Sequence, residues 1–343
     1  MKALVLTAYK HLEYTDVPNP VPAPDEVLIG VKACSICGSD VHGYDGSSGR
    51  RIPPVVMGHE AAGIIVATGA EVQGWRDGDR VTFDSNIFCQ ECGFCHQGLA
   101  NLCDRRRVLG VSCAEYRQEG AFAEFVAVPQ QVLYRLPDAL SFERATLVEP
   151  LSIALHAVGR PKVRLGASAV VVGAGGIGLL VIQALRAAGC GRIIALDLVA
   201  ERLALAERLG ATDCLRADAP AILDAIRDLT GGHGADLTFE AVGSSPAVQL
   251  AVNAARKGGS VTLIGNVTPM VQLPLQAVVT RELTLYGSCG SIDEYPACLD
   301  LLARGVVQAD PLISAVAPMS EGAEWFARLC ARDPALIKVI LKP

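Results

Sequence analysis

The sequence predicts an α/β protein in which a β-rich N-terminal part is followed by a doubly wound parallel sheet. Two patterns predict this fold. Residues 1–150 contain short runs rich in β-branched residues, separated by Pro and Gly turns. From Ser168 onward, apolar strand patterns alternate with helical patterns, which is typical of a parallel sheet covered by helices on both faces. A chain of 343 residues is long enough for about two domains.

The expected elements follow in chain order. The N-terminal strands are KALVLT, EVLIGVKA, GIIVATG, DRVTF and AFAEFVAV, and their spacing predicts a small barrel or sandwich. The strands of the second part are ASAVVVG, RIIALD, DLTFEAVG, GGSVTLIG and RELTLYGS, with helices at LLVIQALRAA, AERLALAERL and LAVNAAR. The tail from about Gly290 is expected to form two helices and a final strand, IKVILK.

Composition excludes several classes of protein. Apolar residues make up 51 % and charged residues 19 %, which argues against a disordered chain. A net charge of −6 disfavours binding to nucleic acid or to an anionic membrane. Leu165–Leu185 is uncharged and long enough to cross a bilayer, but its glycines predict a buried strand, turn and helix instead. The N-terminal apolar run is too short for a signal peptide, so we expect a cytoplasmic protein.

The strongest motif is a group of four cysteines at Cys89, Cys92, Cys95 and Cys103. Four thiolates on one loop can surround Zn²⁺ tetrahedrally and leave no position for substrate, which predicts a structural zinc. Free thiols and an iron–sulfur cluster are the alternatives. Arg105–Arg107 follow directly, and we interpret them as a solvated face, although a zinc ribbon with basic residues could also bind nucleic acid. The twelve cysteines fit reduced thiols in a reducing compartment.

The second motif is GAGGIG at residues 173–178, which follows the apolar run AVVV and opens a helix. This context is that of a dinucleotide-binding loop, with Gly173 at the tight turn and Gly175 where the pyrophosphate approaches. Gly178 allows the helix and strand to pack closely. The helix N-terminus then faces the phosphates.

The next strand, RIIALD, ends in Asp197, 19 residues after Gly178. A carboxylate there accepts hydrogen bonds from a ribose and repels a 2′-phosphate, which favours NAD over NADP. Asp197 can also cap the next helix, and the two roles are compatible. Arg202 can flank the adenine or be a plain surface arginine.

A third pattern is spread along the chain as CGSDVH at residues 37–42, GHE at residues 58–60 and Glu149–Pro150. Cys, His and Glu are suitable ligands for a zinc ion that keeps an open position. Taken singly, each of these residues is more commonly structural. Together with the first two motifs, and in this order, they resemble the zinc-dependent medium-chain dehydrogenases, and most closely the sorbitol (polyol) dehydrogenase branch.

The resemblance covers essentially the whole chain and implies its organisation. Residues 1–150 would form a GroES-like catalytic domain, with a structural zinc lobe at about 86–106. Residues 151–288 would form an inserted Rossmann domain that binds NAD, and residues 289–343 would return to the catalytic domain, with the active site in the cleft. The family also implies a small-molecule substrate and a homo-oligomer, either dimer or tetramer.

The resemblance assigns roles residue by residue. Cys37 and His59 match the catalytic zinc ligands, Glu60 matches a neighbouring ligand, and Glu149 takes or hydrogen-bonds at the remaining position. Asp40 matches the residue that orients the zinc-bound histidine. A substrate hydroxyl acidified by zinc would lose its proton through Ser39 and His42 and transfer hydride to the nicotinamide. The implied cofactor-binding residues are Gly173, Gly175, Gly176, Ile177, Gly178, Asp197, Arg202, Val242, Ile264, Gly265 and Ser288.

The sequence departs from sorbitol dehydrogenase at the substrate pocket. An Arg-Tyr pair of that enzyme aligns with Gly290 and Ser291, and an aromatic residue aligns with Gly43. These changes favour a larger or differently shaped polyol. Arg50 and Arg51 could hold a sugar phosphate, as in galactitol-phosphate dehydrogenases, or be solvated loop residues.

We therefore expect an NAD-dependent zinc dehydrogenase acting on a secondary alcohol of a polyol or sugar-derived substrate. The alternatives are a threonine-type dehydrogenase, a dehydrogenase of sugar-alcohol phosphates, a non-catalytic nucleotide binder and a zinc-ribbon protein that binds nucleic acid. The intact set of four candidate catalytic ligands argues against a non-catalytic relative.

Overall fold

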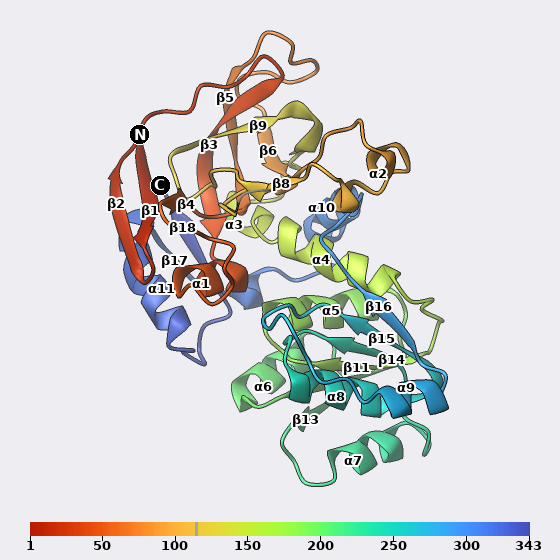
Figure 1. The fold of residues 1–343 in the computed structure, drawn as a ribbon. Helices are drawn as coiled ribbons and strands as arrows, with labels where there is room; N and C mark the ends of the chain where they lie inside the picture. The colour runs from red at the N-terminus through yellow and green to blue at the C-terminus, as the bar shows by residue number, and fades with distance from the viewer. Residues whose placement is uncertain (114–115) are drawn as a thin grey trace. The chain divides into compact units, whose positions relative to one another are not determined.

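The structure is a computed structural model that describes residues 1–113 and 116–343. The chain forms two compact units, drawn as a ribbon in Figure 1. The first unit contains Met1–Glu149, Ser291–Gly305 and Ala309–Pro343. The second contains Pro150–Gly290 and Val306–Gln308. The fold class is α/β, as predicted.

The first unit is built on β-sheet. A seven-stranded sheet has the order β10-β6-β5-β3-β18-β17, with β9 also paired to β3, and a smaller sheet has the order β2-β1-β4. The strands are β1 (Lys2–Ala8), β2 (His11–Asp16), β3 (Glu26–Ser35), β4 (Val55–Val56), β5 (Glu60–Thr68), β6 (Arg80–Phe83), β9 (Phe125–Pro129), β10 (Leu133–Arg135), β17 (Ile313–Pro318) and β18 (Lys338–Lys342). Phe83, Phe122 and Phe326 are fully buried in its core.

The C-terminal tail contributes two strands to this sheet. β18 runs antiparallel to β3, with Ile340 opposite Ser35, and β17 runs parallel to β18. The helices of the unit are α1 (Gly38–Tyr44), α2 (Gly93–His96), α3 (Phe142–Ala145), α10 (Tyr295–Ala303) and α11 (Gly322–Cys330), and α4 (Val148–Gly159) begins here and continues into the second unit. The short pair β7 (Asn86–Ile87) and β8 (Arg107–Val108) brackets the loop that carries the four clustered cysteines.

The second unit is a six-stranded parallel sheet of order β13-β12-β11-β14-β15-β16. Its strands are β11 (Ser168–Val172), β12 (Arg192–Asp197), β13 (Asp213–Arg216), β14 (Ala235–Glu240), β15 (Ala255–Leu263) and β16 (Thr284–Gly287). Its helices are α5 (Gly176–Ala187), α6 (Ala200–Arg208), α7 (Ile222–Leu229), α8 (Ser245–Ala254) and α9 (Leu275–Thr280). The strand order reverses between β11 and β14, which is the arrangement that binds dinucleotides at the carboxyl ends of the strands.

The uncharged stretch at residues 165–185 is divided between β11, a glycine-rich turn and most of α5, as predicted. Among the helices of residues 1–113 and 116–343, none has the length and apolar character needed to span a bilayer.

Candidate active site

The four-cysteine loop brings its sulfur atoms into one cluster. The Sγ atoms of Cys92 and Cys95 lie 3.5 Å apart, those of Cys89 and Cys95 lie 3.9 Å apart, and all four lie within 4.8 Å of one another. A tetrahedral ion with Zn–S bonds of about 2.3 Å requires sulfur separations of about 3.8 Å. The thiolates of an iron–sulfur cluster bind different iron atoms and lie farther apart. The cluster therefore fits a single zinc ion.

Backbone groups of the loop favour thiolate in this cluster. The backbone N–H of Cys92 donates to Cys89 Sγ at 3.4 Å, and the backbone N–H groups of Cys89 and Arg105 donate to Cys103 Sγ at 3.3 and 3.4 Å. Hydrogen bonds from the backbone of Glu91, and then of Cys92, lower the pKa of Cys89 to about 6, whereas burial raises the pKa of Cys95 to about 12. A lowered thiol pKa is what a metal-binding cysteine needs, because the ligand is the thiolate.

A second cluster forms where β3 ends beside the start of β5. Ser35 pairs with Glu60 across these strands, so Cys37, just after β3, comes close to His59, just before β5. Gly58 has a φ of 94°, which favours glycine, and it makes the turn before His59. Ligand atoms of Cys37, His59 and Glu60 lie within 4.8 Å of one another, and the two latter residues are buried.

Asp40 in α1 connects two members of this cluster. Its Oδ1 lies 3.3 Å from Nδ1 of His59, and its Oδ2 accepts a hydrogen bond from the backbone N–H of Cys37 at 3.2 Å. Burial raises the pKa of Asp40, but the charge and hydrogen bond of His59, with Arg51 and Cys37, lower it to about 2. An ionised Asp40 beside Nδ1 leaves Nε2 of His59 available to a metal ion.

The carboxylate of Glu60 has a buried partner that the sequence analysis missed. The Lys338 ammonium contacts both Glu60 carboxylate oxygens, and the Ser35 hydroxyl donates to the same carboxylate. Lys338 comes from β18, which lies beside β3, and both charged side chains are buried. The sequence offered one sign of this buried charge, which is the lysine within the apolar strand pattern IKVILK. This pairing neutralises Glu60, so the cluster carries a carboxylate without an uncompensated buried charge.

Glu149 is not part of the described group whose ligand atoms lie within 4.8 Å. It is buried, and its Oε1 accepts a hydrogen bond from Ser85 Oγ at 3.3 Å. Burial raises its pKa to about 7, with His59 acting in the opposite direction. Ser39 Oγ lies 3.5 Å from Nε2 of His59, whereas Nδ1 of His42 lies 3.2 Å from Ser47 Oγ.

The two consecutive arginines differ. Arg50 is exposed, but Arg51 is only 4 % exposed and its Nη2 lies 3.1 Å from both Asp40 Oδ1 and Ser39 Oγ. The interpretation of Arg51 as a solvated loop residue is therefore wrong. A Cβ added at Gly43 would lie 2.6 Å from Cδ of Arg51. The space expected from the loss of an aromatic side chain at Gly43 is thus filled by the Arg51 stem.

In the second unit, the predicted dinucleotide loop joins β11 to α5. Gly173 has a φ of 95°, and a Cβ at Gly178 would lie 1.7 Å from the carbonyl oxygen of Gly173, so no other residue fits there. A Cβ at Gly175 would meet no atom within 4 Å, which leaves its backbone accessible to a ligand. This loop fits a pyrophosphate at the N-terminus of a twelve-residue helix.

The other predicted cofactor residues lie at the same edge of the sheet. The register aligns Val172 with Leu196 and Glu240, Glu240 with Leu263, and Leu263 with Gly287, so the carboxyl ends of these strands coincide. The predicted residues that end or follow these strands are Asp197, Val242, Ile264, Gly265 and Ser288.

Polar groups at this edge are suited to a ligand. Nε of Arg202 and Oγ of Ser288 are buried without a hydrogen-bond partner, which is costly unless a ligand or water satisfies them. Asp197 accepts hydrogen bonds from the backbone N–H groups of Ala174 and Val199 at 2.7 and 2.9 Å. Its carboxylate therefore ties the end of β12 to the glycine-rich loop and retains capacity for further acceptance.

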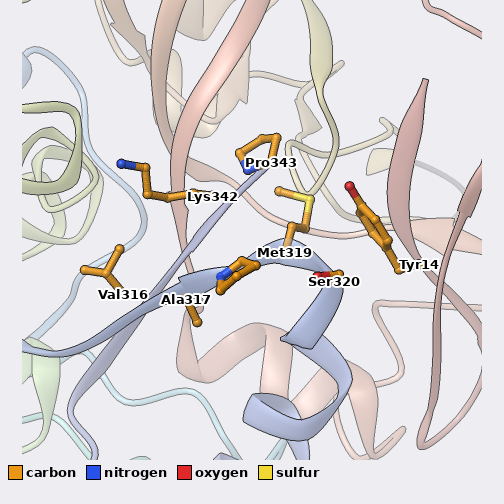
Figure 2. Close-up of a pocket in the computed structure, with 8 residues that line it drawn as sticks. Tyr14, Val316, Ala317, Met319, Ser320, Lys342 and Pro343 are labelled. Atoms are coloured by element: carbon orange, nitrogen blue, oxygen red, sulfur yellow. The ribbon is translucent and has the colours of Figure 1, made fainter.

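A separate hollow of about 310 Å³ opens on the first unit between β2, β17 and β18 (Figure 2). Its lining includes Tyr14, Val316, Met319 and Lys342 and none of the residues of the two clusters. The residues that line this hollow include no group of metal-ligating side chains, so the hollow is not a candidate active site.

Comparisons with known proteins identify the family. Residues 23–138 match the alcohol dehydrogenase GroES-like domain, and residues 176–304 match the zinc-binding dehydrogenase domain. The sorbitol dehydrogenase of Bacillus subtilis (strain 168) is 32 % identical over 100 % of this chain and 97 % of that protein. The chain belongs to the zinc-dependent medium-chain dehydrogenase family. It is therefore a zinc-dependent oxidoreductase with a nicotinamide cofactor, and the predicted resemblance is confirmed.

Two further relatives are informative about substrate and cofactor. The D-arabitol-phosphate dehydrogenase of Enterococcus avium is 32 % identical over 97 % of this chain and 94 % of that protein. A Sinorhizobium meliloti 1021 protein, described as a zinc-binding dehydrogenase and crystallised with NADP, superimposes with a TM-score of 0.91. It is 32 % identical, and the match covers 100 % of this chain and 99 % of that one.

Proposed function

We propose that this dehydrogenase oxidises a secondary alcohol of a polyol or sugar-derived substrate with NAD⁺, using one catalytic and one structural zinc. The observation that carries the proposal is the group of Cys37, His59 and Glu60, with the Ser39 hydroxyl 3.5 Å from Nε2 of His59. Cys37 and His59 would hold the catalytic ion together with Glu60 or Glu149. When bound, zinc acidifies a coordinated hydroxyl. Cys89, Cys92, Cys95 and Cys103 would hold the structural ion.

The surrounding residues prepare proton removal. Asp40 keeps Nδ1 of His59 protonated and its ring orientation fixed, because its carboxylate is held at 3.3 Å. Ser39 would accept the proton of the substrate hydroxyl and pass it toward His42 and solvent. Lys338 keeps the charge of Glu60 balanced.

Asp197 supports NAD as the cofactor. Its buried carboxylate at the end of β12 is where a ribose lies in this fold, and its negative charge would repel a 2′-phosphate. Because one relative was crystallised with NADP, the preference for NAD⁺ over NADP⁺ is tested directly. The cofactor residues proposed above, from the glycine-rich loop to Ser288, lie in the second unit.

The test is NADH or NADPH formation by the zinc-loaded protein over polyols of four to six carbons, their phosphates, inositols, threonine and simple secondary alcohols. We expect turnover of an unphosphorylated polyol, with NAD⁺ preferred. An Asp197→Ser variant should narrow that preference, since the repelling charge is removed. Turnover of phosphates alone would favour the sugar-alcohol-phosphate alternative, and turnover of threonine alone would favour the threonine-type alternative. A wild-type preference for NADP⁺ would overturn the cofactor assignment.

We further propose a cytoplasmic homo-oligomer. None of the twelve cysteines forms a disulfide, which fits a reducing compartment. β16 is an edge strand of the parallel sheet, and the segment before it exposes Met270, Leu275 and Val279. An edge strand beside exposed apolar side chains is suited to pairing with a second copy. Light scattering of the purified protein distinguishes dimer, tetramer and monomer.

A further inference from the structure

Arg51 is a buried arginine whose guanidinium binds two residues of α1. Its Nη2 donates to Ser39 Oγ and to Asp40 Oδ1, each at 3.1 Å, and its side chain is 4 % exposed. Ser39 is the proposed proton acceptor, and Asp40 faces the proposed zinc ligand His59. One guanidinium therefore contacts two of the residues that prepare proton removal.

The fold holds Arg51 in this place from both sides. The backbone N–H groups of Ser112 and Cys113 donate to the carbonyl oxygen of Arg50, at 3.0 and 3.2 Å. The Ser112 hydroxyl donates to the carbonyl oxygen of Ile52 at 2.8 Å and accepts from its backbone N–H at 2.5 Å. The residues on either side of Arg51 are thus fixed to one short segment, so the side chain is directed inward.

The stem of Arg51 packs on Gly43 of α1. A Cβ at Gly43 would lie 2.6 to 2.9 Å from Cδ, Cγ and Cβ of Arg51. Contacts that short do not occur, so any larger residue at this position would displace the arginine. Gly43 therefore provides the space that the Arg51 side chain occupies.

The charge of Arg51 is already balanced. Asp40 is fully buried, and it is the acidic partner of the guanidinium. Nη2 is thus engaged with α1, whereas the buried Nε of Arg51 has no hydrogen-bond partner among the described residues, so the test below includes phosphorylated substrates. The hydrogen bond to Ser39 occupies one of the two lone pairs of the hydroxyl oxygen and leaves the other to accept a proton.

We propose that Arg51 is a positioning residue, which fixes the Ser39 hydroxyl and the Asp40–His59 pair for proton removal from the substrate. This inference rests on the proposed function. Arg51 acts through Ser39 and Asp40, and it does not contact the substrate. A planar guanidinium can bridge two acceptors, whereas an ammonium on a flexible stem holds them less well.

The test compares Arg51→Met and Arg51→Lys with the matched control Arg50→Met, whose side chain is exposed. We expect Arg51→Met to lower kcat about 10- to 100-fold with little change in KM, as is usual when a residue supporting a metal ligand is removed. Arg51→Lys should recover part of the loss, and Arg50→Met should behave as wild type. A rise in KM confined to phosphorylated substrates would overturn the proposal, since it would make Arg51 a substrate ligand.

A double-mutant comparison tests the route of the effect. In a Ser39→Ala background, Arg51→Met should lower kcat by a smaller factor than in wild type, because one of the two groups that Arg51 positions is gone. Full additivity would contradict action through Ser39.

A spectroscopic measurement separates this proposal from the proposed function. The protein is loaded with Co²⁺, and the absorption of the Cys37 site is obtained by subtracting the spectrum of Cys37→Ala. Arg51→Met and Arg51→Lys should shift these bands, since His59 loses its orientation, while Arg50→Met should not. Unchanged bands in both Arg51 variants would overturn the inference. If wild type turns over no alcohol but the bands shift, the proposed function fails and the positioning role stands.

Discussion

The two candidate metal-binding clusters of the first unit are built in opposite ways. The ligands of one all lie within Cys89–Cys103, are sulfur only, and receive hydrogen bonds from the backbone of the same loop. The ligands of the other come from the ends of β3 and β5 and differ in type. They are surrounded by buried charged partners, Asp40, Lys338 and Arg51. A loop can close around an ion by itself, whereas an open, reactive position must be held by the fold.

This difference predicts where each metal ion contributes free energy. Most residues of the loop between β7 and β8 are exposed or half-buried, so its ion should stabilise folding. The buried cluster is held by strand pairing and ion pairs, so its ion should contribute to the reaction and little to stability.

The largest expected effect is on activity at the buried cluster. Cys37→Ala should reduce kcat by roughly 10³-fold or more, because Lewis-acid stabilisation is worth several kcal/mol. The melting temperature should stay close to that of wild type. Steady-state kinetics and thermal unfolding measure both, with Cys113→Ala as a control that removes a thiol outside both clusters. Persistent activity in Cys37→Ala would remove Cys37 from the catalytic site.

The opposite pattern is expected at the loop. Cys103→Ser should lose about one equivalent of zinc and lower the stability by several kcal/mol, because a closed site contributes folding free energy. Activity per folded molecule should fall much less than in Cys37→Ala. Zinc analysis and thermal unfolding are the measurements. If zinc content and melting are both unchanged, the loop is not a structural metal site.

The contrast between a local loop and a site assembled from distant strands also explains which features could be predicted from the sequence. The cysteine loop and the glycine-rich turn are local patterns, so spacing alone indicates their geometry. The contact of Lys338 with Glu60 joins residues 278 positions apart and depends on the pairing of β18 with β3, which no local pattern specifies. Arg50 and Arg51 are adjacent and chemically identical, yet one is exposed and the other buried. The anchoring of their backbone to Ser112 and Cys113, and the contacts of Arg51 with α1, distinguish them.

Asp84 lies in the segment that joins β6 to β7, before the loop of the four cysteines. It follows β6, and its neighbours are Ser85, which donates to Glu149, and Asn86, which begins β7. The Oδ1 of Asp84 accepts hydrogen bonds from the backbone N–H and Nδ2 of Asn86 at 2.8 and 3.0 Å. Burial raises the pKa of Asp84 to about 6 from its ordinary value of 3.8, although the bonds from Asn86 oppose the shift.

A raised carboxyl pKa makes the folded state bind more protons than the unfolded state between about pH 4 and pH 6. Stability therefore falls as pH rises through this range, and the full cost above pH 6 is about 3 kcal/mol for a shift from 3.8 to about 6. Asp84→Asn keeps an acceptor for Asn86 but cannot ionise. We expect it to raise the melting temperature at pH 8 and to do so much less at pH 4.5.

The control is Asp138→Asn, since that side chain is fully exposed. It should change melting little at either pH. An equal gain from Asp84→Asn at both pH values would show that packing, and not ionisation, accounts for the effect. A gain confined to high pH, with zinc content and kcat unchanged, would assign this cost to the ionisation of the buried Asp84 and to neither metal site.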